Sequence, residues 1–382
     1  MKILLVFIDM IRVDFLNIYN PSANCSLLDK RLKRIGGIVY TNCFTPGPDT
    51  PRSMACMQTG LNPYYNGCDT RIKWPKYFVK DGISSIWDHA IEKGMKINLC
   101  CNKNETITGF FKYQEHENIK LFYNPSDFIS YGNFEENSLS FIGIPDMHTA
   151  VTDYYSSNYA FKKGDKIVNY FFERYISDAF ISQFDYTIIF SDHGFQLASE
   201  RINMSSSLEL LDDSRTKLLM FLHKSDSKNI IPDSRLASMI DLYATIEHLI
   251  GRNEYRQGFS FLMKPQRLIT HVEDHKDFRV YPEIMIKQWR VISKSFDFKS
   301  DASENILVEG SEEDIKSATD YLENNSPKYC EYVKQLQVWS YYATLKSEES
   351  SLYFAGLSRI HPIAHVLLKY IYKIKSVILR SL

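Results

Sequence analysis

Apolar and polar positions follow two rhythms that alternate along most of the chain. Short runs of β-branched and aromatic residues, such as Lys2–Ile8 and Tyr186–Phe190, are typical of buried strands. Between such runs, apolar residues recur at helical spacing, as in Leu27–Ile35. The pattern predicts strands at 2–8, 38–40, 96–100, 139–144, 186–190 and 217–222, and helices at 27–35, 51–59, 83–92, 159–176 and 234–250.

This alternation predicts an α/β fold whose largely parallel central sheet is flanked by helices. The character changes near Gln257. The later segments that we predict are short meander strands at 268–272, 278–281 and 289–293, then helices at 312–322 and 330–345. We therefore expect three parts, which are a large domain over 1–255, a smaller antiparallel α+β subdomain over 256–350 and a helical tail over 351–382.

The tail has an amphipathic pattern with basic residues among its apolar positions, including Lys369, Lys373 and Arg380. A basic amphipathic helix can lie on an anionic membrane surface. It can equally pack on the large domain or on a dimer partner. The pattern leaves these alternatives open, and the oligomeric state is not predicted.

Charge and cysteine usage narrow the class of protein. The 382 residues carry a formal net charge of -1, which argues against a nucleic-acid partner. The seven cysteines show no metal-type spacing, and their odd number does not favour a disulfide framework. The first apolar run is too short for a signal peptide, and no run reaches the roughly 20 apolar residues of a membrane span. We therefore expect a cytoplasmic protein, with peripheral contact at the inner membrane face if the tail binds lipid.

Two predicted strands are followed within one to three residues by metal-ligand side chains. Asp192 and His193 follow Tyr186–Phe190, and Asp9 follows Lys2–Ile8. In parallel sheets, sites form at the carboxyl ends of the strands. Carboxylate and imidazole groups that meet there can bind one hard or borderline divalent ion. The alternative is that each Asp caps the next helix or turn.

Thr50 precedes Pro51 and a short predicted helix. One interpretation is an ordinary helix start, with Thr at the N-cap and Pro at the first helical position. The other is that its hydroxyl, at a helix N-terminus that favours anions, is a nucleophile activated by a nearby metal ion. Arg52 would then offer its guanidinium to phosphate-like oxygens.

Three further residues are candidate ligands. Asp146 and His148 follow the strand predicted at 139–144 and can point the same way from extended chain. His271 lies in a segment dense in acidic and histidine side chains. Positions in solvent-facing loops or hairpins are the alternative for all three.

Taken together, these segments resemble the alkaline phosphatase/sulfatase superfamily, on its sulfatase-like branch. The resemblance runs in order over roughly residues 1–295. The segments that carry it are Ile8–Asp14, Phe44–Gly60, Phe141–His148, Ser191–Gly194, Ser214–Met220, Met239–Ile246 and Met285–Ile292. It implies an alkaline phosphatase-like fold and a metal-dependent hydrolase or transferase.

Thr50 stands where the resemblance places the Cys or Ser that sulfatases convert to formylglycine. A threonine cannot become that aldehyde, and Met54 replaces the arginine that usually follows. Threonine nucleophiles occur in relatives that act on phosphodiesters and phosphonates or transfer phosphoethanolamine and glycerol phosphate. The resemblance therefore favours phosphoryl or phosphonyl esters over sulfate esters.

The resemblance also implies the ligand set. One divalent ion (Zn, Mn, Ca or Mg) would be held by Asp9, Thr50, Asp192 and His193. A site with a second ion, bound by Asp146, His148 and His271, is less favoured. The reason is that Asp146 and His148 are closer together in sequence than the corresponding ligands of the members that bind two zinc ions. By analogy with single-metal relatives, His148 is the candidate general acid.

The expected function is transfer or hydrolysis of a phosphoryl-type ester through Thr50, on a small molecule or a glycan. A cytoplasmic enzyme of surface polysaccharide biosynthesis would fit these features. The rivals are a sulfate-ester hydrolase and a catalytically inactive metal-binding scaffold.

Overall fold

The computed structural model describes residues 1–69, 79–101, 116–135, 137–144, 156–197, 200, 207–264, 266–276, 286–301, 305–327 and 329. Residues Met1–Ser326 form one compact unit that contains two β-sheets. The chain from Pro327 onward belongs to a second unit, of which only 327 and 329 are described. Within the described residues, no helix is both long enough and apolar enough to cross a membrane.

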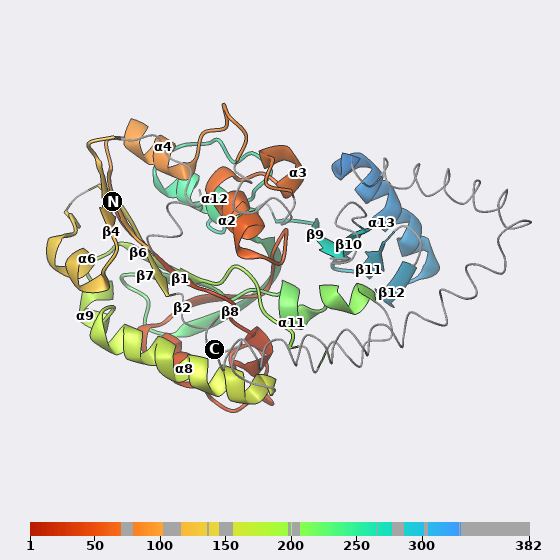
Figure 1. Ribbon diagram of the computed structural model, residues 1–382, viewed down its shortest axis with the longest axis horizontal. Coiled ribbons are helices and arrows are strands. Elements are labelled where there is room, and N and C mark those ends of the chain that lie inside the picture. Colours follow the sequence, from red (N-terminus) through yellow and green to blue (C-terminus); the bar gives the residue numbers. More distant parts are fainter. Residues whose placement is uncertain are drawn as a thin grey trace, which may run out of the picture. The chain divides into compact units, whose positions relative to one another are not determined.

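The larger sheet has eight strands in the order β4-β3-β5-β1-β6-β7-β2-β8 (Figure 1). Its strands are β1 (Lys2–Ile8), β2 (Gly37–Phe44), β3 (Lys96–Cys100), β4 (Ile119–Phe122), β5 (Ser138–Ile144), β6 (Tyr186–Phe190), β7 (Met220–Lys224) and β8 (Ile230–Ser238). All neighbouring pairs are parallel except those that β7 makes with β6 and β2. The predicted α/β fold with a largely parallel sheet is confirmed.

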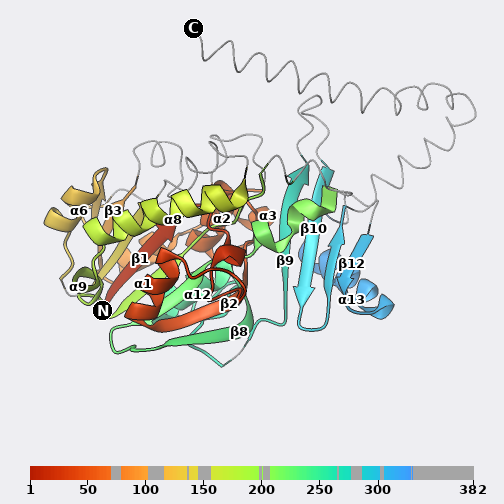
Figure 2. The same ribbon diagram turned by 90° about the horizontal axis from the view of Figure 1, so that it is seen from below.

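Helices cover both faces of this sheet (Figure 1). On one face lie α2 (Thr50–Thr59), α3 (Pro63–Asn66), α4 (Ile86–Glu92) and α12 (Met239–Leu249). On the other face lie α1 (Leu27–Ile35), α6 (Pro125–Tyr131), α8 (Ser157–Arg174) and α9 (Asp178–Ile181), with α1 and α8 side by side (Figure 2).

Strand β1 is buried on both faces, which explains its uninterrupted apolar run. Ile3, Leu5 and Phe7 belong to the core beneath α2, α4 and α12. Leu4 and Val6 belong to the opposite core, beneath α1 and α8. Because successive side chains of a strand point to opposite faces, one short strand contributes to both cores.

The smaller sheet is antiparallel, in the order β12-β11-β10-β9. Its strands are β9 (Ile269–Lys276), β10 (Ile286–Ser293), β11 (Asp297–Ser300) and β12 (Asn305–Glu309), followed by α13 (Glu312–Asn325). Two short segments before β7, η2 (Ser207–Leu211) and α11 (Asp213–Thr216), contact this sheet through buried side chains such as Leu211. The predicted change from alternating strands and helices to short meander strands, near Gln257, falls between α12 and β9.

Several element predictions differ from the structure, and the strand predicted at 278–281, the helix predicted at 330–345 and the tail over 351–382 lie outside the described residues. The helix predicted from Ser234 begins at Met239, because residues 230–238 pair with β2 as strand β8 and Ser238 closes a capping box with Asp241. The strand predicted from Lys217 begins at Met220, after α11. Strands β4, β11 and β12 were not predicted, since each has only four or five residues.

Candidate metal centre

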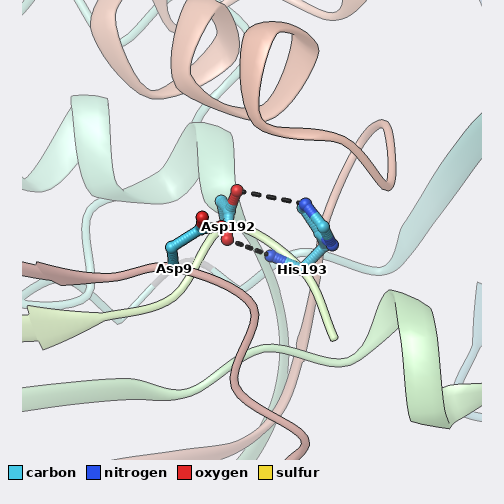
Figure 3. Close-up of side chains that lie close together, drawn as sticks. All are labelled: Asp9, Asp192 and His193. Carbon is cyan, nitrogen blue, oxygen red and sulfur yellow. Dashed lines mark hydrogen bonds and ion pairs between the residues drawn. The ribbon is translucent and has the colours of Figure 1, made fainter. Parts of the chain in front are cut away.

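Neighbouring strands bring Asp9 and Asp192 to the same level at one edge of the sheet. Strands β1 and β6 run parallel, and Phe7 pairs with Phe190. Each aspartate lies two residues beyond its member of this pair, at the carboxyl end of its strand. Figure 3 shows Asp192 between Asp9 and the imidazole of His193. The predicted convergence of strands β1 and β6 on one site is thus present.

One carboxylate oxygen of Asp192 is held by backbone amides. The amide of Met10 donates to Oδ1 at 3.1 Å, and the amide of His193 donates to the same oxygen at 2.9 Å. Met10 reaches this position with φ of 59°, a left-handed conformation that costs a non-glycine residue energy. The other oxygen, Oδ2, is buried and receives no hydrogen bond in the described structure. Asp192 is therefore oriented with one oxygen directed at its neighbours in the cluster.

His193 is oriented by its other ring nitrogen. Nδ1 lies 2.6 Å from the carbonyl oxygen of Gly194, which can only accept, so Nδ1 is the donor in this contact. Nε2 is thereby directed toward the cluster, 3.2 Å from Asp192 Oδ2. Gly194 is needed for this turn, because a Cβ there would lie 2.1 Å from the carbonyl oxygen of Ser214.

Thr50 is the first residue of α2, and its hydroxyl faces the cluster. Its Oγ1 lies 3.5 Å from Asp9 Oδ1 and 3.4 Å from His193 Nε2. The interpretation of Thr50 as the N-cap is wrong, because Asp49 occupies that position and accepts the amide hydrogen of Arg52. As a consequence the Thr50 side chain is not used to cap the helix.

The chemistry and spacing of these groups fit a divalent cation. Ligand atoms of Asp9, Asp192 and His193 all lie within 4.8 Å of one another. Two ligands of a tetrahedral zinc ion, each about 2.0–2.1 Å from the metal, lie roughly 3.3–3.4 Å apart, close to the spacings found here. The buried Oδ2 of Asp192 also lacks the hydrogen-bond donor that a buried carboxylate requires. A cation between these atoms would supply the missing partner.

Of the other three predicted ligands, the structure places His271 alone, and it does not bring His271 to this cluster. Asp146 and His148, the latter expected as general acid, lie outside the described residues. His271 is buried in β9, where Nδ1 lies 3.3 Å from the Tyr321 hydroxyl and Nε2 lies 3.2 Å from Glu273 Oε1. Among the described residues, His271 belongs to no group of three ligand side chains.

Arg52 does not offer its guanidinium to the site. The side chain is only 1% exposed, and its Nε donates to Asp49 at 2.6 Å. One terminal nitrogen donates to the carbonyl oxygen of Glu273 at 2.9 Å and the other to Asp274 at 2.7 Å. The expectation that Arg52 contacts a phosphate-like group is not met, because these partners occupy its donors.

Sequence reasoning also missed Asp49 and Asp274, the two acidic partners of Arg52. An acidic residue directly before Thr50-Pro51 is itself an N-cap signal, which could have identified Asp49. No local signal marks Asp274, since its partner lies 222 residues earlier in the chain.

Comparisons with known proteins identify the fold. No protein-family model matches the chain, and no curated protein matches it in sequence. Among solved structures, BT1596, a 2-O GAG sulfatase, superposes with a TM-score of 0.63 at 14% identity, covering 92% of this chain and 93% of the other.

Two further structures extend the comparison. A protein in the alkaline phosphatase superfamily from Vibrio parahaemolyticus gives a TM-score of 0.59 at 14% identity, covering 83% of this chain and 84% of the other. The phosphonate monoester hydrolase of Agrobacterium radiobacter gives a TM-score of 0.60 at 10% identity, covering 88% and 95%. The chain therefore has the fold of sulfatases and other members of the alkaline phosphatase superfamily.

Proposed function

We propose that this chain is a metal-dependent hydrolase or transferase that acts on phosphoryl or phosphonyl esters through Thr50. The observation that carries the proposal is the position of one hydroxyl. Thr50 Oγ1 lies within 3.5 Å of both Asp9 and His193, at the start of a helix and at the carboxyl edge of the sheet. The shared fold with a phosphonate monoester hydrolase supports the reaction class.

The residues of the cluster have separate tasks. Asp9, Asp192 and His193 would hold a divalent ion, which when bound supplies positive charge that favours an ionised alcohol. Thr50 Oγ1 forms the new bond to phosphorus and gives up its proton to solvent. The N-terminus of α2 places the positive end of a helix dipole beside the anionic group. Buried Asp192 and its amide donors keep the cluster fixed during this change.

The proposed reaction proceeds in two steps, which are formation and then breakdown of a phosphothreonine. As the Thr50 oxygen bonds to phosphorus, the bond to the departing alcohol oxygen breaks, and that oxygen takes the electron pair and gains a proton. His148 or water is the proposed donor of this proton. Water or a sugar hydroxyl next bonds to phosphorus and loses a proton, while the bond from phosphorus to the Thr50 oxygen breaks and that oxygen regains a proton, which restores the threonine. The acceptor decides whether the net reaction is hydrolysis or transfer, and a sugar acceptor would place the enzyme in surface glycan modification.

Threonine distinguishes this proposal from a sulfatase. The formylglycine of sulfatases carries two oxygens on its hydrated aldehyde, and Thr50 offers one hydroxyl. Release of sulfate from an aryl sulfate by the purified protein would favour the sulfatase alternative. Failure to turn over aryl phosphodiesters, phosphonates and sulfates with Zn, Mn, Ca or Mg would favour an inactive scaffold.

The test is a pair of matched threonine variants in α2. We expect Thr50→Ala to abolish turnover of an aryl phosphonate or phosphodiester while the metal content stays close to that of the wild type. Thr59→Ala is the control, because its hydroxyl bonds only to the backbone of Ala55 at the other end of the helix. Full activity in Thr50→Ala would remove this residue from the mechanism.

A further inference from the structure

Four buried charges of alternating sign connect the smaller sheet to the residues around Thr50. Arg52 lies between Asp49 and Asp274, and Arg215 pairs with the second oxygen of Asp274. All four side chains are no more than about a tenth exposed. The order along this chain of ion pairs is Asp49, Arg52, Asp274 and Arg215, and we refer to it as the ion-pair chain.

The ion-pair chain joins parts of the molecule that are distant in sequence. Asp49 is the N-cap of α2, and Arg52 lies in the first turn of that helix. Asp274 lies in β9 of the smaller sheet, and Arg215 lies in α11. The carboxylate of Asp274 therefore ties the smaller sheet to the helix that begins with the proposed nucleophile, next to the bond from Arg52 to the Glu273 carbonyl oxygen.

The loop before Thr50 is also held through its own backbone carbonyl groups, by strand β9 and by Arg215. The amide of Glu273 donates to the carbonyl oxygen of Pro46 at 2.8 Å, and Arg215 donates to that of Pro48 at 3.3 Å. Gly47 packs directly on Arg52, since a Cβ at this glycine would lie 2.9 Å from the arginine Cβ. The loop is thus held between the β9 backbone and the two arginines.

The charges of the ion-pair chain cancel internally. Burial acts to lower the pKa of Arg52, but Asp49 and Asp274 raise it above its ordinary value. Burial likewise acts to raise the pKa of Asp49, and Arg52 lowers it below the ordinary value of a carboxyl. Because two carboxylates neutralise two guanidinium groups, the arrangement orients the chain and leaves no spare positive charge for a substrate.

We propose that Asp274 is a positioning residue, which acts through Arg52 and Asp49 to aim the Thr50 hydroxyl at the Asp9, Asp192 and His193 cluster. This inference rests on the proposed function for the role of Thr50. The proposal means that the smaller sheet helps to orient the nucleophile, although the sheet contributes none of the three cluster ligands. Replacing Asp274 by Asn leaves Arg52 and Arg215 facing a neutral amide, so the first turn of α2 is held less firmly in its orientation.

The test measures whether side chain 50 is directed at the metal ion, and it needs no substrate. A Thr50→Cys variant of the full chain is loaded with Co²⁺, because a thiolate bound to cobalt gives a charge-transfer absorption band that a distant thiol does not. We expect this band in Thr50→Cys. In Thr50→Cys with Asp274→Asn, we expect cobalt to bind at the same stoichiometry while the band falls at least several-fold.

Asp297→Asn in the Thr50→Cys background is the matched control. Asp297 is also a buried carboxylate of the smaller sheet, and among the described residues its side chain pairs with Arg290 of the same sheet, at 2.9 and 2.6 Å. The control should keep the full band even if its thermal stability falls as much. If Asp274→Asn does not fold, Arg52→Lys serves instead, since one ammonium cannot span Asp49 and Asp274 as the guanidinium does.

The outcomes separate this inference from the proposed function. A full band in the Asp274→Asn variant, or an equal loss in the Asp297→Asn control, would overturn the positioning role alone. Cobalt bound to Thr50→Cys without any band would show that side chain 50 is not directed at the ion, and both proposals would fall. With the native threonine and a working substrate, we expect Asp274→Asn to lower kcat while KM changes little.

Discussion

At the scale of the residue, each oxygen of Asp192 has its own task. Oδ1 accepts the amides of Met10 and His193, which fixes the loop, and Oδ2 faces His193 Nε2. An asparagine can still accept both amides with its carbonyl oxygen, but it presents an NH₂ group in place of Oδ2. The structural and ligand functions of this side chain can therefore be separated by one substitution.

We expect Asp192→Asn to fold and to lose bound metal, measured by elemental analysis after dialysis against a divalent ion. Removing one anionic ligand from a small set should weaken binding at least 10-fold. Asp185→Asn is the control, because this exposed carboxylate precedes the same strand and contacts the chain's first residues. Unchanged metal content in Asp192→Asn would contradict its assignment as a ligand.

At the scale of the element, α2 depends on the residues at its two ends. Its N-cap is Asp49, and its C-cap is Gly60, which has φ of 65°. A Cβ at Gly60 would lie 2.3 Å from the ring of Tyr243 on α12. The glycine therefore ends the helix and lets it pack closely on its neighbour.

Gly60→Ala should cost clearly more stability than Gly82→Ala. Gly82 also has positive φ, of 82°, but a Cβ there meets nothing within 4 Å. The control should lose about 1–2 kcal/mol from the left-handed backbone alone, and Gly60→Ala should lose roughly 1–3 kcal/mol more from overpacking. Urea unfolding measures both values, and equal losses would show that the Tyr243 ring moves aside without cost.

The N-cap gives α2 a dependence on pH. Arg52 and its backbone amide lower the pKa of Asp49 although burial opposes this, so the folded state binds the Asp49 proton more weakly than the unfolded state does. The stabilisation from this carboxylate is complete above the unfolded pKa of about 3.9, and it is lost as the pH falls through the lower folded value.

Asp49→Asn should reduce the loss of folding stability at acidic pH. Asparagine is also a good N-cap, so the helix start is retained while the charge is removed. We expect a lower free energy of unfolding at pH 7 and a smaller further loss below about pH 4 than in the wild type. Urea titrations at a series of pH values measure the two slopes, and parallel curves would contradict the ionised role of Asp49.

At the scale of the whole molecule, the sequence pattern predicts which residues lie at the ends of strands better than it predicts which side chains pair with one another. Asp9, Thr50, Asp192 and His193 each lie within three residues of an apolar run or a helix start, so local pattern finds them. Parallel pairing of β1 with β6 then brings two of them together. The role of Arg52 was misjudged for the opposite reason, because its partner Asp274 depends on how the second sheet docks, which no local pattern encodes.

Arg290 is a further buried cation that joins the two sheets. From β10 it pairs with Asp297, and it also donates to the carbonyl oxygen of Leu211 and to the hydroxyl of Thr216, in the segments just before β7. Together with Arg52 and Arg215, it links the smaller sheet to the larger one. Since both sheets belong to one compact unit, we expect them to unfold together.

Native-state hydrogen exchange tests this cooperativity. In the wild type, the slowest amides of β1 and β10 should exchange through the same global opening. Arg290→Met leaves buried carboxylate and carbonyl groups without their donor, so protection should fall by about 10- to 1000-fold, and by the same factor in both strands. A loss confined to β9, β10 and β11 would instead mean that the smaller sheet opens independently. In that case the orientation of Thr50 would depend on a sheet that can detach while the larger one stays folded.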